Sequence, residues 1–89
     1  MSEDKRRERL RFRSWHRGTR EMDLLLGSFA DEHVPAFSQE QLDLYELLLE
    51  QADPDLYNWI IGSATVPPQF DNDVTQKLCK HSYAGRRTI

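Results

Sequence analysis

The sequence predicts an all-α protein, folded as a compact bundle of about five short helices. Apolar residues recur at helical spacing along most of the chain, and proline and glycine residues interrupt that pattern. Neither alternating β-branched runs nor an Asn-Gly hairpin signal is present. The 89 residues suffice for one domain. We expect its core to span about residues 5–81, and residues 84–89 to form a flexible tail.

The first two helices are expected at about residues 5–14 and 19–33. The first segment is rich in arginine and glutamate and has only Leu10 and Phe12 as apolar members, so a thin stripe would face the core. Pro35 prevents the second helix from continuing much further. That helix carries one apolar face at the i, i+3, i+4 and i+7 positions: Met22, Leu25, Leu26 and Phe29.

Capping residues mark the starts of the next two helices. Ser38 followed three residues later by Gln41 forms a capping box, in which each side chain satisfies a backbone N–H of the other residue. Asp53 is expected as the N-cap of the fourth helix, with Pro54 at its first position and Gly62 placed to end it. The third helix has an extended apolar face: Leu42, Leu44, Tyr45, Leu47, Leu48 and Leu49.

A fifth helix is expected at about residues 69–81, after a loop that contains a Pro-Pro pair. Phe70, Val74 and Leu78 recur every four residues and would form its buried stripe. Cys79 lies beside that stripe, so we expect a small half-buried cysteine rather than a nucleophile.

Most aromatic residues are expected in the core. Trp59 shares an apolar stripe with its neighbours on the fourth helix, and we assign it to the core with Phe29, Tyr45 and Phe70. Trp15 lies outside any clear stripe, so the sequence leaves its position open.

Charge is distributed unevenly along the chain. Residues 1–20 hold eight Lys/Arg and three Asp/Glu, whereas residues 21–76 hold twelve Asp/Glu and no Lys or Arg. Residues 77–89 add four more cations and no acid, and the formal net charge is −3. Two interpretations follow: the chain binds charged partners, or its basic ends fold back onto the acidic middle and neutralise it.

Other features of the sequence indicate a cytosolic protein. A single cysteine cannot form a disulfide within the chain, and no secretory signal is present. The arginine-rich start also contains Glu3, Asp4 and Glu8, which is unlike a mitochondrial transit peptide. The longest apolar run, residues 24–26, is far too short to span a bilayer.

The sequence indicates neither a metal site nor a catalytic centre. The side chains with soft ligand atoms are His16, His33, Cys79 and His81. No pair has C-x-x-C or H-x-x-x-H spacing, and Cys79 and His81 would point to different faces of a helix. The glycines stand alone, so there is no phosphate-binding loop.

Nucleic-acid binding is the main alternative function. Six basic residues precede the aromatic Trp15, and such an arm can neutralise phosphates. The body opposes this interpretation, because its acidic residues would repel a duplex and the isoelectric point is about 5.5.

An R-G-x-x-E motif lies where the basic segment meets the acidic body, at Arg17, Gly18 and Glu21. If Gly18 begins a helix, the three residues share its first turn, and alanine would be tolerated at position 18. A cation and a carboxylate would then flank bare main chain, which suits docking to a partner better than chemistry. Alternatively, Gly18 only separates two helices, and Arg17 and Glu21 form a weak surface ion pair.

At this motif the sequence resembles the SdhE-type FAD assembly factors of succinate dehydrogenase, small proteins known as flavinators. Their R-G-x-x-E signature corresponds to Arg17, Gly18 and Glu21, and the acidic Asp23 follows before an apolar helix. A D-P-D-L-x-x-W segment lies about thirty residues further on, at residues 53–59. The resemblance covers nearly the whole domain and implies a five-helix bundle, which agrees with the periodicity.

The resemblance implies a function that the residues alone do not reveal. Such proteins assist covalent attachment of FAD to a histidine of the succinate dehydrogenase flavoprotein subunit, and in some cases of fumarate reductase. They are binding and assembly factors rather than enzymes, so no tightly bound cofactor is expected, and direct FAD binding stays open. By resemblance, Arg17, Gly18 and Glu21 contact the flavoprotein. The mitochondrial members of this family carry a targeting segment, and no such segment is recognised in this sequence. We therefore expect a bacterial cytoplasmic location.

Overall fold

The computed structural model describes residues 2–81, and within them it contains five α-helices and no strand. These are α1 (Ser2–Trp15), α2 (Arg20–His33), α3 (Gln39–Leu49), α4 (Asp53–Ile61) and α5 (Asp73–Lys80), with short 3₁₀ turns η1 (Val34–Ala36) and η2 (Pro68–Phe70). The all-helical prediction is thus confirmed. The expected tail at residues 84–89 lies outside the described residues.

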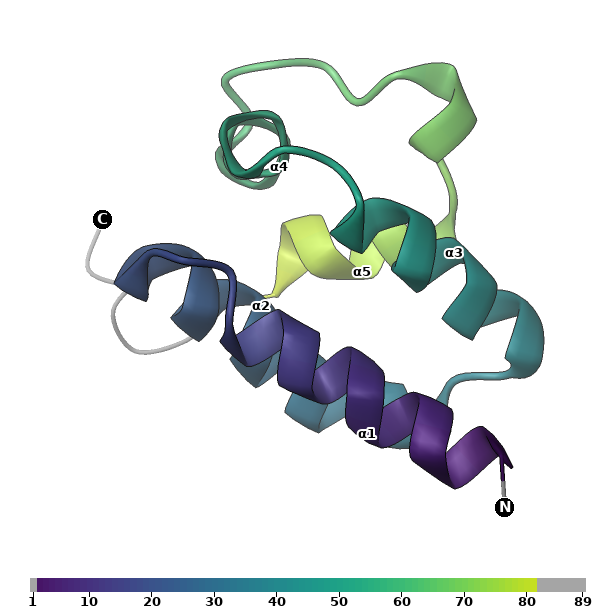
Figure 1. Cartoon of the computed structure of the whole chain (residues 1–89). Coiled ribbons are helices and arrows are strands. Elements are labelled where there is room, and N and C mark those ends of the chain that lie inside the picture. Colours follow the sequence, from purple (N-terminus) through teal and green to yellow (C-terminus); the bar gives the residue numbers. More distant parts are fainter. Residues whose placement is uncertain (1, 82–89) are drawn as a thin grey trace.

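The helices form two packed groups (Figure 1). Helices α1 and α2 run antiparallel, side by side, while α5 contacts both α3 and α4 and lies between them and α2. A long arch of chain connects α4 to α5. None of the helices in the described part of the chain is long and apolar enough to cross a membrane.

Local capping chemistry sets two of the helix ends as predicted. The Ser38 hydroxyl accepts a hydrogen bond from the Gln41 N–H at 3.1 Å, and the Gln41 side chain accepts one from the Ser38 N–H at 2.9 Å. Gly62 ends α4 with φ of +85°, a left-handed conformation that favours glycine. The capping box and this C-terminal stop are therefore confirmed.

Two predicted helix starts are wrong. Ala52, not Asp53, has the N-cap conformation of α4, and Asp53 lies inside the first turn with its carboxylate bonded elsewhere. Helix α5 begins at Asp73 rather than near residue 69, because Asn72 caps it by accepting a hydrogen bond from the Thr75 N–H at 3.0 Å. Phe70, expected within this helix, instead ends the separate 3₁₀ turn η2.

The core is formed by apolar side chains from all five helices and the turn after α2. Its buried members are Leu10, Met22, Leu25, Leu26, Phe29, Ala30, Val34, Phe37, Leu42, Tyr45, Leu48, Leu49, Leu56, Ile60, Val74 and Leu78. Five predicted members lie further out: Phe12 is 63% exposed, Leu47 is 50% exposed, and Leu44, Trp59 and Phe70 are half-buried. The rings of Trp59 and Phe70 pack on each other, 5.4 Å apart, at the edge of the core.

The close approach of α1 to α2 depends on Gly27. A Cβ atom built on Gly27 would lie 2.1 Å from the Trp15 ring, which packs directly over the glycine. The Trp15 indole N–H also donates to the Asp31 carboxylate at 3.3 Å. Trp15, whose position the sequence left open, therefore packs α1 onto α2.

One polar pair is buried in the core. The Ser14 hydroxyl lies 2.7 Å from the Leu10 carbonyl, to which it donates, and 2.6 Å from the Tyr45 hydroxyl, from which it then accepts. Burial raises the pKa of Tyr45 well above its ordinary value of 10.0. The neutral phenol is therefore the form that this core accommodates.

Replacing Tyr45 with phenylalanine should lower the free energy of unfolding by about 1 kcal/mol near neutral pH, because the buried hydrogen bond is lost. The pKa of Tyr45 is higher in the folded chain than in the unfolded chain, so above about pH 10 only the unfolded chain loses this proton. Wild-type stability should then fall as the pH rises, and its advantage over Tyr45→Phe should shrink. Urea unfolding of both proteins at pH 8 and pH 10.5 tests this, and a constant difference would contradict it.

Candidate functional site

The R-G-x-x-E motif lies in the turn between α1 and α2, at one end of the helix pair. Gly18 is exposed and has φ of +116°, a conformation that side-chain-bearing residues rarely adopt. Helix α2 begins only at Arg20, where Thr19 is the N-cap and accepts a hydrogen bond from the Met22 N–H at 3.3 Å. Gly18 therefore does not begin α2 but separates it from α1, which is the second of the two interpretations offered by the sequence. Alanine at this position would strain the backbone.

Asp23 holds this turn in shape from the first turn of α2. Its Oδ1 atom accepts hydrogen bonds from the backbone N–H of Arg17 at 2.6 Å and of Gly18 at 3.3 Å. The acidic residue that follows the motif in sequence thus fixes the main chain of the motif itself. Sequence reasoning noted Asp23 as part of the pattern but did not identify this role.

Arg17 points inward and joins two loops. Its Nε donates to Asp53 Oδ1 at 2.9 Å, and its Nη2 donates to the Gln51 carbonyl at 2.8 Å. Its Nη1 donates to the Leu49 carbonyl, and the side chain is only 11% exposed. We call these contacts the Arg17 clasp. They fasten the α1–α2 turn to the α3–α4 turn, which explains why the Asp53 carboxylate is not a helix cap.

The outer surface of the motif is a ridge between two shallow depressions. Glu21 is exposed and lines a depression of about 290 Å³ together with Met22, Asp53, Pro54 and Tyr57. A second depression of about 510 Å³ includes the exposed Gly18, Trp15, His16, Arg20, Asp23 and Leu24. Thr19 borders both. The ridge offers bare main chain, a carboxylate and adjoining apolar surface, which suits a protein partner better than a small-molecule substrate.

Several arginines of the basic N-terminal helix have partners within the chain. Arg6 contacts Asp43 at 2.5 Å and Glu46 at 2.9 Å, and these hydrogen bonds raise the pKa of Arg6. Three further arginines have partners in α2, α3 and the turns: Arg7 with the Val34 and Phe37 carbonyls, Arg11 with Asp31, and Arg13 with Glu46. The interpretation that the basic ends fold back onto the acidic middle is confirmed for the N-terminal helix, whereas Arg86 and Arg87 lie outside the described residues. Arginines so engaged are poorly placed to neutralise phosphates, which weighs against nucleic-acid binding.

Among the three histidines and the cysteine considered for metal binding or catalysis, His16 and Cys79 lie apart from the others, and only His33 and His81 lie together. His16 is exposed and stacks on Phe12, with ring centroids 4.0 Å apart. Cys79 is half-buried, as expected, with its Sγ 3.5 Å from the Trp59 carbonyl. His33 and His81, which are far apart in sequence, instead meet at the other end of α2.

Comparison with known proteins gives a consistent result. The family described as "Flavinator of succinate dehydrogenase" matches residues 8–82. A Dictyostelium discoideum protein named "Succinate dehydrogenase assembly factor 2, mitochondrial" is 46% identical over 85 residues, which are 92% of this chain and 60% of that protein. An Acetobacter pasteurianus "FAD assembly factor SdhE" is 35% identical over 81 residues, 91% of this chain and 74% of that protein.

A Debaryomyces hansenii protein, also named "Succinate dehydrogenase assembly factor 2, mitochondrial", is 42% identical over 77 residues, 86% of this chain and 54% of that protein. The chain therefore spans a little over half the length of these two mitochondrial relatives and about three quarters of the Acetobacter protein. The residues matched by the family begin within α1, run to the end of α5 and span the segment that holds the R-G-x-x-E motif.

Proposed function

Because the chain belongs to the flavinator family of succinate dehydrogenase, we propose that it binds the flavoprotein subunit of succinate dehydrogenase and promotes covalent attachment of FAD to it. The fumarate reductase flavoprotein is a second client to test. The chain acts as an assembly factor rather than an enzyme, and the chemistry takes place on the partner. A bacterial cytoplasmic location stays a prediction, since the relatives include a bacterial SdhE and mitochondrial proteins alike.

The observation that carries this proposal is that the exposed ridge of the R-G-x-x-E motif is fixed by hydrogen bonds from Arg17 and Asp23. Gly18 and Glu21 lie on the surface, whereas Arg17 and Asp23 fix the turn through bonds directed into the chain. We assign contact with the flavoprotein to the Gly18 main chain and the Glu21 carboxylate. Arg17 belongs to the same binding site as a positioning residue, because its guanidinium is already bonded to Asp53 and to backbone carbonyls.

A rigid docking surface is sufficient for this activity. If the bundle binds the flavoprotein conformation in which flavin and histidine are close and aligned, it lowers the barrier without supplying a catalytic group. Positioning of this kind contributes up to several kcal/mol in well-oriented reactions. FAD is then handled on the partner, and the residues described in this chain need only recognise protein.

Glu21→Gln is the sharpest test of the contact surface. The amide keeps the size of the side chain but loses the charge, so a charge-assisted bond to the partner weakens. We expect flavin attachment to slow about tenfold, which corresponds to about 1.4 kcal/mol. The measurement follows the fluorescence of covalent flavin in the flavoprotein subunit on denaturing gels, over time, with each variant added.

The matched control is Glu40→Gln. Glu40 is likewise exposed in the first turn of a helix, but that helix is α3 and lies outside the motif. It should leave the rate unchanged. A normal rate with Glu21→Gln would remove Glu21 from the contact, and equal rates with and without the wild-type chain would overturn the proposed function. Gly18→Ala is a less direct test. Gly18 has φ of +116°, so an alanine there would strain the backbone in addition to changing the contact surface.

A further inference from the structure

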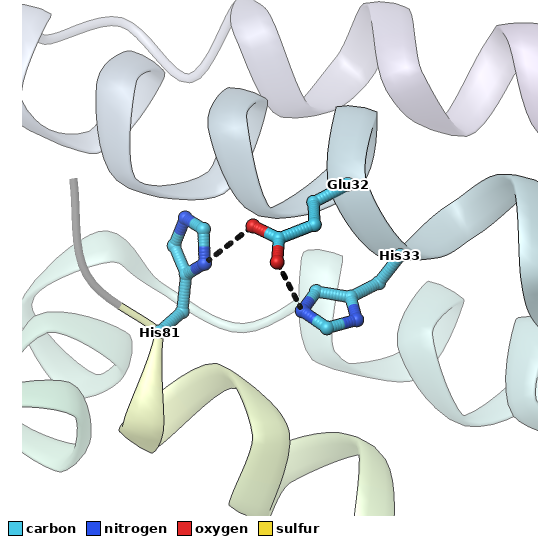
Figure 2. A group of neighbouring side chains, drawn as sticks. All are labelled: Glu32, His33 and His81. Carbon is cyan, nitrogen blue, oxygen red and sulfur yellow. Dashed lines mark ion pairs between the residues drawn. The ribbon is translucent and has the colours of Figure 1, made fainter.

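Three potential metal ligands converge at the far end of α2 from the R-G-x-x-E motif (Figure 2). Glu32 and His33 occupy the last turn of α2, and His81 follows the last turn of α5. Glu32 Oε1 lies 3.5 Å from His81 Nδ1, and Glu32 Oε2 lies 3.9 Å from His33 Nε2. One ligand atom from each residue falls within 4.8 Å of the other two. The two imidazoles thus flank one carboxylate, although they are 48 positions apart in sequence.

A neighbouring hydroxyl orients His81, whose side chain is only 5% exposed. The Ser28 hydroxyl lies 2.6 Å from the Leu24 carbonyl and donates its hydrogen there. Its oxygen, 2.9 Å from His81 Nε2, then accepts from that nitrogen. The neutral ring consequently carries its lone pair on Nδ1, which is the atom that faces Glu32. Metal-binding histidines are commonly held by such a bond from their other nitrogen.

Aromatic packing restricts both imidazoles. Phe29 lies beneath them, with its ring centroid 4.6 Å from that of His33 and 5.5 Å from that of His81. Phe37 stacks against the outer side of His33 at 6.2 Å. This packing therefore keeps the two rings near each other, and the exposed Glu32 carboxylate lies between them.

We propose that Glu32, His33 and His81 form a binding site for one Zn²⁺ ion. Imidazole nitrogens and a carboxylate oxygen suit zinc, and bonds of about 2.1 Å in tetrahedral geometry place ligand atoms about 3.4 Å apart. The Glu32–His81 separation of 3.5 Å already meets that requirement. A rotation of the half-buried His33 side chain toward Glu32 completes three ligands, and a water molecule takes the fourth position. The ion would tie the end of α2 to the end of α5.

Two charged groups work against this site. Lys77 and Lys80 line the same depression of about 310 Å³, and their ammonium groups oppose a nearby cation. Protons compete as well, because an imidazolium–carboxylate contact replaces the metal when the histidines are protonated. Zinc binding should therefore weaken as the pH falls, because the ligand atoms must be free of protons to bind the ion.

Calorimetric titration of zinc chloride into the full chain, purified without a polyhistidine tag at pH 7.5, tests the proposal. We expect one ion per chain, and NMR signals of the His33 and His81 rings that shift while those of the exposed His16 do not. Glu32→Gln and His33→Gln should each weaken binding at least about tenfold, by analogy with losses seen at metal sites. Glu50→Gln, at the end of α3, is the matched control and should bind as the wild type does.

Three results would overturn the site. These are no detectable binding, binding that survives both Glu32→Gln and His33→Gln, and zinc shifts that appear at His16. His81 variants are not used, since the buried ring packs on Phe29 and its loss would disturb the fold. The zinc titration needs no flavoprotein, so its result is independent of the proposed assembly function.

Discussion

Replacing Arg17 with alanine should lower the free energy of unfolding by about 2–3 kcal/mol, a large share of the stability of so small a chain. The Arg17 clasp supplies bonds to the Asp53 carboxylate and to the carbonyls of Leu49 and Gln51. Alanine leaves all of these acceptors without the guanidinium, and Arg17 and Asp53 are largely shielded from water. Urea unfolding monitored by circular dichroism gives the value.

Two further variants show whether the geometry of the clasp matters or only its charge. Arg17→Lys should recover less than half of the lost free energy of unfolding, because the compact ammonium group of lysine cannot reach all three acceptors that the planar guanidinium of arginine contacts. Arg13→Ala is the matched control: Arg13 is more exposed and lies 3.7 Å from Glu46, so its loss should cost less than about 1 kcal/mol. Equal destabilisation by Arg13→Ala and Arg17→Ala would contradict a special role for the clasp.

The Arg17→Ala variant should also promote flavin attachment poorly under conditions where it remains folded. Without the clasp, the bonds from Asp23 still shape the α1–α2 turn but no longer fasten it to the α3–α4 turn, so the exposed Gly18 and Glu21 lose their fixed position relative to α4. Glu21→Gln, in contrast, should reduce attachment while changing the free energy of unfolding much less than Arg17→Ala does. This difference separates a positioning residue from one that contacts the partner.

Local patterns predicted the local parts of this structure. Apolar spacing located all five helices, and the Ser38–Gln41 capping box and Gly62 set helix ends as expected. These features depend on residues within one or two turns of each other. The wrong start of α5 also has a local cause: Asn72 competes with the upstream segment as a cap, and periodicity alone cannot decide between them.

The site depends on contacts that spacing does not encode. Arg17 reaches Asp53 across 36 positions, and the sequence offers several acids that would serve equally well. The meeting of His33 with His81 likewise follows from how α5 packs on α2, so motif spacing gave no sign of it. The resemblance identified the R-G-x-x-E residues, but their division between inward Arg17 and outward Glu21 required the fold.

Gly27→Ala should lower the free energy of unfolding by about 2–3 kcal/mol, although alanine is the better helix former. The added methyl group would lie 2.1–2.5 Å from three atoms of the Trp15 ring, so α1 and α2 must move apart or the indole must leave its place. Moving the indole also breaks its bond to Asp31. Urea unfolding, followed by tryptophan fluorescence and circular dichroism, measures the loss.

Removing the tryptophan should reverse the sign of this effect. In a Trp15→Ala background the space above Gly27 is open, so Gly27→Ala should raise the free energy of unfolding by up to about 1 kcal/mol through helix propensity alone. A stabilising osmolyte in all samples keeps the weaker variants folded for comparison. If Gly27→Ala destabilised both backgrounds equally, Trp15 would not be its obstacle. A reversal would locate the cost in this one contact, which a double-mutant cycle expresses as a coupling between positions 15 and 27.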